Sequence, residues 1–291
     1  MRLLIATGGS PHSENAMQLG AQILRARAHH FQAELHQPSP SPLPAEETPT
    51  VLMVIRREAE RARAEVRLNH HLALLGESLP LVSAKIRVGH RADEILREAT
   101  TGRYGLVILG KRPAHRLVTR FIGSTATRVI ENAPCPVLVA KGQVRPIRRI
   151  LLCDSGAQSP VLLDSFKREL GELVETKAEV TVLHVMSQIG AAPGVRGQQL
   201  RAEAEALMQA GTPEGELLAY DLAALQRINV RPQPKVRHGP VVNEIIKEAQ
   251  QGDYDLVAIG ASCRQGWWSI LLENLERQVI AQIDRPVLVV R

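Results

Sequence analysis

The sequence of 291 residues is 44% hydrophobic and 23% charged, which is typical of a globular protein with room for two domains. Its formal net charge of +6 raises the question of nucleic-acid binding, but only 3% of the residues are aromatic, too few for a platform on which bases stack. No apolar run approaches the roughly 20 residues that cross a bilayer. These features argue against a membrane protein and make nucleic acid an unlikely partner.

The cysteines Cys135, Cys153 and Cys263 are odd in number and lie far apart beside apolar runs. This spacing predicts neither a disulfide framework nor a zinc site, and it favours a reducing, cytoplasmic location. We expect Cys135 and Cys153 to be small buried hydrophobes rather than nucleophiles. The ten histidines include only sequential pairs, which cannot face one metal ion, so no metal site is predicted.

The first elements of the chain predict a strand, a turn and a helix. Leu3–Thr7 is a short apolar run that reaches Gly8, Gly9 and Ser10 at once, which indicates a first strand rather than a signal peptide. Ser10 followed by Pro11 is typical of a helix start. The expected helix runs to about Ala28, and the residues expected on its buried face are Ala16, Leu19, Ile23 and Leu24.

Gln37–Pro49 is proline-rich and predicts an exposed, partly disordered loop. Thr50–Ile55 predicts the second strand. Glu58–Leu75 predicts a helix, whose inward face we expect to hold Ala59, Ala62, Val66 and Ala73. An alternative joins Thr50–Leu75 into one long helix and places the strand near Ala33–His36; we favour the first interpretation.

The rest of the first half repeats this alternation. Lys85–Val88 predicts the third strand, and Ala92–Thr100 predicts a helix with Ile95, Leu96 and Ala99 inward. Leu106–Leu109 predicts a strand that stops at Gly110 and is followed by a basic loop. The helix expected over Thr125–Asn132 and the strand expected over Val137–Ala140 complete the unit.

The two halves of the chain are copies. Lys85-Ile86-Arg87-Val88-Gly89 recurs 150 residues later as Lys235-Val236-Arg237-His238-Gly239. The same offset relates Glu94, Glu98 and Tyr104 to Glu244, Glu248 and Tyr254, and it holds to Pro286-Val287-Leu288-Val289. The period is too long for a solenoid repeat and predicts a duplicated domain, with domains at residues 1–143 and 144–291.

The second half predicts a matching series of elements. Val144–Arg149 is a basic linker, Ile150–Asp154 the first strand, Val161–Leu173 a helix and Val180–Val185 a strand. A glycine-rich loop and helical segments around Leu200–Leu225 follow. Alternating strands and helices predict an α/β fold of two tandem doubly wound domains, each with a parallel sheet covered on both faces.

Ligands of such sheets bind at the carboxyl ends of the strands, where the strand order reverses. In the first half this places three segments around one crevice: Thr7–Ser10, Gly110–Pro113 and Gly123–Thr125. A glycine lets a ligand approach the backbone, and the start of a helix offers N–H groups to phosphate. Capping of that helix by Ser124 and Thr125 is the alternative role of the two hydroxyls.

These residues resemble the universal stress protein family in its tandem form. The signature of the family is a glycine, two residues, a second glycine, nine residues and Gly-Ser or Gly-Thr, and a Cys-Pro-Val-Leu-Val strand follows. Gly110, Pro113, Gly123-Ser124 and Cys135–Val139 reproduce it with one substitution. The resemblance implies a Rossmann-like domain of the adenine nucleotide alpha hydrolase type and ATP as the ligand. The expected binding residues are Thr7, Gly8, Gly9, Gly110, Lys111, Arg112, Gly123, Ser124 and Thr125.

The chain departs from this signature in both halves. Pro113 replaces the second glycine and has no N–H to offer a phosphate, and Gly8 stands where the family usually has an aspartate. In the second half Asp154 is present, but Cys263 replaces a glycine and Glu273-Asn274 replaces Gly-Ser. A carboxylate at a phosphate site is repulsive, so we expect ATP in the first domain only and a capping role for Glu273 and Asn274.

In this family the last strands of two domains pair side by side. The resemblance therefore implies an intramolecular pseudo-dimer through Val137–Ala140 and Val287–Val290, and a homodimer of two chains is a further expectation. We expect a cytoplasmic stress-response protein that binds ATP as a regulatory ligand and is not an enzyme, because no Walker-type lysine, general base or carboxylate pair for a metal is evident. The alternative is a nucleotide-free scaffold that binds partners.

Overall fold

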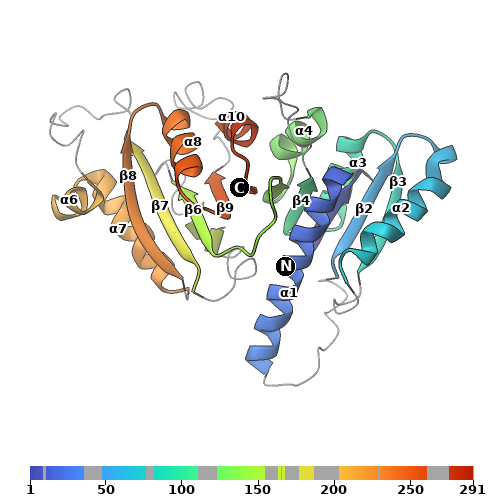
Figure 1. Ribbon diagram of the computed structural model, residues 1–291, viewed down its shortest axis with the longest axis horizontal. Helices are drawn as coiled ribbons and strands as arrows, with labels where there is room; N and C mark the ends of the chain where they lie inside the picture. Colours follow the sequence, from blue (N-terminus) through green and yellow to red (C-terminus); the bar gives the residue numbers. More distant parts are fainter. Residues whose placement is uncertain are drawn as a thin grey trace. The chain divides into compact units, whose positions relative to one another are not determined.

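The structure is a computed structural model that describes most of the chain. It describes residues 1–8, 11–35, 48–76, 82–110, 123–154, 163–164, 166–167, 177–186, 203–228, 230–260 and 275–290. The chain divides into two compact units (Figure 1). The first holds Met1–Pro146 together with Arg285–Val289, and the second holds Ile147–Asp284 together with Val290–Arg291.

The first unit alternates strands and helices as predicted. Its elements are β1 (Leu3–Thr7), α1 (Pro11–Leu35), β2 (Thr50–Ile55), the short 3-10 helix η2 (Glu58–Glu60), α2 (Arg61–Ala73), β3 (Ser83–Val88), α3 (Arg91–Thr101), β4 (Leu106–Gly110), α4 (Ser124–Asn132) and β5 (Val137–Ala140). The strands are parallel and lie in the order β3-β2-β1-β4-β5. They are apolar and β-branched because both faces of the sheet are covered.

The strand register shows which helices cover which face. Ile5 pairs with Val51 and Ile108, so these side chains share one face, and an added Cβ on Gly20 of α1 would lie 2.4 Å from Ile5 Cδ1. Ala6 and Lys85 belong to the next row and point to the opposite face, where Lys85 reaches Glu98 of α3. Helices α1 and α3 therefore lie on opposite faces, which confirms the predicted two-sided sheet.

Helix α1 extends further than predicted, to Leu35 rather than to about Ala28. Its expected face is correct: Ala16, Leu19 and Ile23 are completely buried and Leu24 is 1% exposed. Because residues 33–35 are helical and Thr50–Ile55 is a strand, the alternative assignment for this region is wrong. The proline-rich loop expected over Gln37–Pro49 lies mostly outside the described residues.

The predicted inward face of the next helix is wrong. Ala59, Ala62 and Ala73 are exposed, and the side chain of Val66 is 71% exposed. The residues that α2 buries are Ala64, Leu68 and His71. Their spacing of four and three is equally helical, so the sequence pattern alone did not decide which of the two sets faces the sheet.

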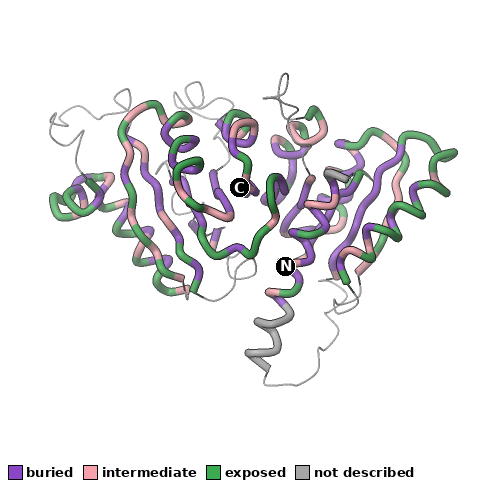
Figure 2. Tube along the Cα trace, in the orientation of Figure 1, coloured by how far each residue is buried: buried purple, intermediate pink, exposed green. Residues whose placement is uncertain are grey.

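The remaining elements of the first unit follow the prediction closely. Ile95 and Ala99 of α3 are buried, whereas Leu96 is only half-buried; Glu94 and Glu98 are buried beside them. Helix α4 begins after Gly123, whose extended backbone is the N-cap, so Ser124 and Thr125 lie inside the first turn and are not the cap residue. Figure 2 shows the central strands as buried and β3 as mixed.

The second unit has the same architecture. Its elements are β6 (Arg149–Cys153), β7 (Glu179–Met186), α6 (Ala204–Gln209), α7 (Pro213–Gln226), β8 (Arg231–His238), α8 (Val241–Gln251), β9 (Leu256–Gly260) and α10 (Leu275–Gln282). The parallel order is β9-β6-β7-β8. In the predicted helix Val161–Leu173 only four residues are described; they are helical, and Leu163 and Phe166 among them are buried.

The last strand of the chain completes the sheet of the first unit. β10 (Val287–Val290) pairs antiparallel with β5, with Val287 opposite Val139 and Leu288 opposite Leu138. All four of these side chains are completely buried. The predicted pairing of Val137–Ala140 with Val287–Val290 is therefore confirmed, and it covers an apolar edge of β5 that would otherwise be open.

Candidate functional site

The candidate site lies where the strand order of the first unit reverses. The chain places β2 on one side of β1 and β4 on the other, so β1 and β4 flank the topological switch point. Ala6 pairs with Leu109, and the next residues, Thr7 and Gly110, end their strands together at the carboxyl edge. Gly110 in turn pairs with Ala140 of β5. The fold thus brings together two of the three predicted segments.

Two glycines at this edge leave open space beside the backbone. A Cβ added to Gly8 or to Gly123 would meet no heavy atom within 4 Å among the described residues. The N–H of Gly8 donates to the Ser13 hydroxyl at 3.3 Å, which fixes the turn between β1 and α1. Both glycines are exposed. As far as the described residues go, no side chain fills the space beside the backbone at these two glycines, which lets a ligand approach it.

The third predicted segment is the start of α4. Gly123 has φ −61° and ψ 147° and no side chain, so no side-chain oxygen caps the first turn from this position. The first amide groups of any helix lack intrahelical acceptors, and the helix dipole adds positive potential there. Ser124 is exposed and Thr125 half-buried. Gly9, Lys111 and Arg112, also predicted, lie outside the described residues.

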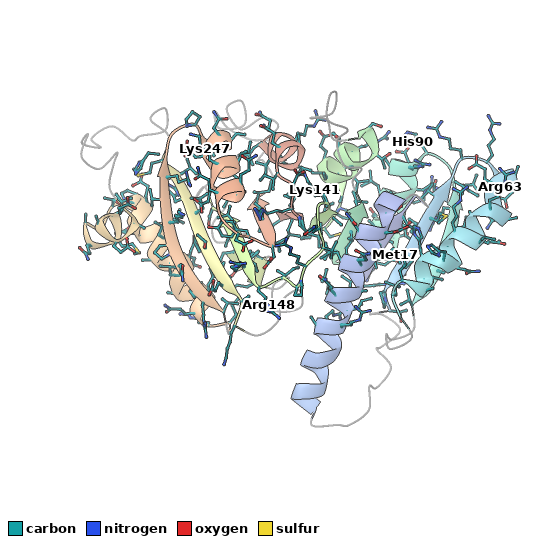
Figure 3. The ribbon with its side chains drawn as sticks, in the orientation of Figure 1. Met17, Arg63, His90, Lys141, Arg148 and Lys247 are labelled. Carbon is teal, nitrogen blue, oxygen red and sulfur yellow. The ribbon has the colours of Figure 1, made fainter. Side chains whose placement is uncertain are left out.

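A buried lysine follows β5 at the same edge of the sheet. Lys141, labelled in Figure 3, is only 5% exposed although it is charged. The next residue, Gly142, has φ 65°, a conformation that favours glycine, and its carbonyl accepts a hydrogen bond from Asn15 Nδ2 in α1 at 3.0 Å. The carboxyl end of β5 is therefore tied to the first turns of α1.

Beneath the edge, Thr7 contacts a histidine that the sequence did not single out. Thr7 Oγ1 lies 2.6 Å from His71 Nδ1, and the two side chains are 5% and 3% exposed. Burial lowers the pKa of His71 and the neighbouring His70 lowers it further, against a weaker opposing effect of Glu14. A neutral imidazole therefore fixes the end of β1 to α2. In the sequence, the burial of His71 could have been inferred only from its helical spacing, which puts it on the same face of α2 as Ala64 and Leu68.

The second unit differs at the equivalent place. Leu3 pairs with Leu106 and Ile150 pairs with Leu256, so the residue equivalent to Thr7 is Asp154. Asp154 is 4% exposed, and its backbone forms a hydrogen bond with the side chain of His184, which is 9% exposed. Burial lowers the pKa of His184, although the nearby Glu214 and Asp154 oppose this. The predicted departures at Cys263, Glu273 and Asn274 lie outside the described residues.

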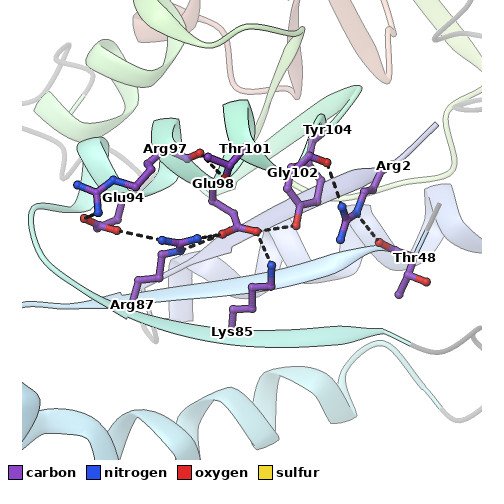
Figure 4. A network of polar contacts seen from close by, with 10 residues as sticks. All are labelled: Arg2, Thr48, Lys85, Arg87, Glu94, Arg97, Glu98, Thr101, Gly102 and Tyr104. Atoms are coloured by element: carbon purple, nitrogen blue, oxygen red, sulfur yellow. Dashed lines mark hydrogen bonds and ion pairs between the residues drawn. The ribbon is translucent and has the colours of Figure 1, made fainter. Parts of the chain in front are cut away.

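Each unit also contains a buried glutamate with the same three donors. In the first, Glu98 accepts from Lys85 Nζ at 2.7 Å, Arg87 Nε at 2.8 Å and the Tyr104 hydroxyl at 2.9 Å (Figure 4). In the second, Glu248 accepts from the equivalent donors at 2.8, 2.5 and 2.6 Å, namely Lys235, Arg237 and Tyr254. The two glutamate side chains are 1% exposed. The recurrence of Glu98 as Glu248 was already visible in the sequence repeat.

The charges in this glutamate cluster perturb each other. Burial alone would raise the pKa of Glu98, but the hydrogen bonds from Lys85, Arg87 and Tyr104 outweigh it and hold the pKa below its ordinary value. Burial and the adjacent carboxylate raise the pKa of Tyr104 to about 12. The same balance lowers the pKa of Glu248 and raises that of Tyr254. In each unit the buried carboxylate accepts from three donors of the cluster, so we assign the cluster a structural role.

Two other predictions about reactive groups can be compared with the structure. Cys135 and Cys153 are buried, and burial raises the pKa of Cys153. They are the small buried hydrophobes that the sequence predicted.

Among the described residues no group of three or more His, Cys, Asp or Glu side chains could hold a metal ion. No helix in this part of the chain is long and apolar enough to cross a membrane.

The fold and this edge define a tandem α/β protein with a doubly wound parallel sheet in each unit. The model of the universal stress protein family matches residues 1–141 and again residues 146–291. The chain therefore belongs to the universal stress protein family, with two copies of its domain.

Individual relatives agree with this assignment. A universal stress protein of Thermus aquaticus is 30% identical over 144 residues, which are 48% of this chain and 97% of the relative. One of Mycolicibacterium smegmatis is 25% identical over 252 residues, or 84% of this chain and 81% of the relative. The solved structure of a universal stress protein from Archaeoglobus fulgidus covers 100% of this chain and 98% of its own with a TM-score of 0.67. At 14% identity it supports the fold alone.

Proposed function

We propose that the first unit binds ATP at the carboxyl edge between β1 and β4, and that this binding is regulatory. The observation that carries the proposal is the open backbone at Gly8 and Gly123, where an added Cβ would meet no described atom within 4 Å. Gly123 also precedes the first turn of α4, whose amide groups and dipole suit a phosphate group. The resemblance of the sequence signature to ATP-binding members of the family points to the same ligand.

The proposal assigns ATP to the first unit only. Its expected contacts are the backbone at Thr7–Gly9 and Gly110, the start of α4 at Gly123–Thr125, and the cations Lys111 and Arg112. In the second unit, Asp154 follows the first strand, as the aspartate of the family signature does, and it stands in the register of Thr7. The departure that opposes ATP is Glu273, which replaces the glycine that corresponds to Gly123 in the repeat. A negative charge at a phosphate site opposes binding.

We infer a stress-response role without catalysis, in the cytoplasm. Two of the three cysteines, Cys135 and Cys153, are buried thiols, which suits a reducing compartment. The described residues around the edge supply backbone amides, hydroxyls and glycines, which bind and orient a phosphate but do not move a proton at neutral pH. Release of phosphate from ATP at a rate above that of a Ser124→Ala variant would contradict the absence of catalysis.

The test is a calorimetric titration of ATP, with and without magnesium, into the full chain and into Gly123→Glu. This variant copies the residue of the second half, and its carboxylate weakens ATP binding by about tenfold or more if it faces the phosphates. The matched control is Val66→Glu, which adds the same side chain at a position that is 71% exposed on α2. Absence of heat at millimolar ATP overturns the proposal in favour of a nucleotide-free scaffold. Equal affinity for ATP in Gly123→Glu and in Val66→Glu would mean that ATP binds elsewhere in the chain.

A further inference from the structure

The open edges of the two sheets differ in their backbone hydrogen-bonding groups. Among the described strands, β3 lies at one end of the first sheet and β8 at one end of the second. Ser83 N–H donates to Pro49 O at 2.9 Å and Gly89 N–H donates to Ile55 O at 2.9 Å. Residues of a strand alternate in the direction of their N–H and C=O groups. The N–H and C=O groups of Ala84, Ile86 and Val88 therefore face away from β2.

In β8 two of the positions that face away from the neighbouring strand carry proline, and one of them, Pro234, is equivalent to Ala84. Arg231 N–H donates to Ala178 O at 2.8 Å and Gly239 N–H donates to Met186 O at 3.0 Å, so the odd-numbered residues face β7. The even-numbered residues Pro232 and Pro234 face the open edge, where proline has no N–H to offer. Because these two residues face away from β7, their rings remove no hydrogen bond between β7 and β8. They do remove two N–H donors from the outer edge of β8. Prolines placed in this way protect an edge strand from pairing.

The edge of β3 has no such protection. The residue equivalent to Pro234 is Ala84, since Lys85 pairs with Leu52 as Lys235 pairs with Leu183. Ala84 is exposed, and Val88 is one of few large apolar side chains that are exposed, at 39%. Both belong to the face of the sheet that α1 and α2 cover. Within the part of the chain that the structure describes, the edge thus combines three backbone N–H groups that face away from β2 with apolar side chains that water still reaches.

The charges along β3 do not prevent pairing with a copy of itself. Lys85 and Arg87 lie between the edge-facing residues and point to the other face of the sheet. Both are bound by Glu98, and Arg87 also lies 3.6 Å from Glu94. Arg97 also lies 3.1 Å from Glu94, so three cations meet two carboxylates and the cluster keeps one net positive charge. Two copies of a cluster with so small a net charge do not repel each other strongly, and most of the positive charge that would attract an acidic partner strand is already matched.

We propose that β3 is the surface through which two chains associate, with the β3 strands of the two copies paired antiparallel about a two-fold axis. An antiparallel strand edge is self-complementary, because each N–H and C=O of one copy meets its counterpart in the other. The prolines of β8 leave outward-facing N–H groups at Val236 and His238 only, against three along β3, so β3 is the edge better suited to pairing. Association through a single isologous edge closes after two copies and does not continue into a fibre.

The test compares Ala84→Pro with Pro234→Ala in the full chain by sedimentation equilibrium, from about 1 µM to about 1 mM protein. Ala84→Pro introduces the residue that the second unit already accepts at this position, and it removes one donor from each copy. We expect the wild type to dimerise and Ala84→Pro to raise the dimer dissociation constant by about tenfold or more. Pro234→Ala alters the β8 edge only and leaves the dissociation constant unchanged.

Three results overturn the proposal. The first is that the wild type stays monomeric up to the highest concentration. The second is that Ala84→Pro dimerises with the same dissociation constant as the wild type. The third is that Ala84→Pro and Pro234→Ala raise the dissociation constant equally. Circular dichroism shows whether Ala84→Pro is folded. If it is not, Val88→Lys takes its place, because a charge added at the end of the edge weakens pairing without removing a ladder bond. A Val88→Lys dimer of unchanged affinity is then the contradicting result.

Discussion

Replacing the buried glutamate of the first unit, Glu98→Ala, removes the acceptor of three donors at once. Removing one partner of a buried ion pair costs about 3–5 kcal/mol, because the other charge stays buried. The cost here falls at the lower end, since Lys85 and Arg87 are 39% and 30% exposed and water can reach them. Tyr104 is only 3% exposed and its hydroxyl loses the Glu98 carboxylate, which adds to the loss. We expect about 3 kcal/mol less stability, a large share of the 5–15 kcal/mol typical of a domain.

The measurement has to separate the two units, because a two-domain chain need not unfold in one step. Hydrogen–deuterium exchange of peptides from α3 and from α8 does so. Glu98→Ala should accelerate exchange in α3, and Glu248→Ala should accelerate it by a similar factor in α8. The control is Glu65→Ala on the exposed side of α2, which should change stability by less than about 0.5 kcal/mol. An effect of Glu98→Ala no larger than that of Glu65→Ala would refute the structural role of the cluster.

Two further predictions concern the first unit. Burial lowers the pKa of His71 from 6.5, so its contribution to stability is complete above pH 6.5 and is lost as the pH falls below it. His71→Gln can still accept from Thr7 but does not titrate, so exchange in α2 should depend less on pH between 7 and 5; an unchanged pH dependence contradicts the assignment. Leu288 is completely buried against Leu138 in the β5–β10 pair, so Leu288→Arg should destabilise the first unit by about 3 kcal/mol or more and accelerate exchange in β5. Tyr220→Arg, at a position 50% exposed on α7, is the control for the added charge, and an equal effect of the two would count against the pairing.

The sequence by itself determined the order of the strands along the chain and the duplication. The apolar runs that became β1, β2, β4 and β5 were bounded by glycine, proline and charge, and a fully buried parallel strand can hardly look otherwise. The repeat at 150 residues predicted two copies of one fold. The glycine and Gly-Ser signature predicted the family. These features are local or periodic, so they can be seen without a structure.

Which residues meet across the sheet was decided only by the tertiary structure. At the offset of 150 residues Thr7 would match Ala157, but the strand registers match it with Asp154, because the connections before the repeated portion differ in length. Likewise, His71 on α2 came to lie 2.6 Å from Thr7 through helix packing. The buried face of α2 was mispredicted for the same reason: two sets of residues have helical spacing, and only the sheet beneath selects one of them.

The same holds for the edges of the sheets. The prolines of β8 were plain in the sequence, yet only the hydrogen bonds of Arg231 and Gly239 show that Pro232 and Pro234 point outward. The last strand was predicted to pair with β5, and the structure adds that Arg285–Val289 belongs to the compact first unit. The sequence specified the elements and the family through local patterns of burial. The partners of each residue depend on strand register and helix packing, which arise from contacts between segments far apart in the chain.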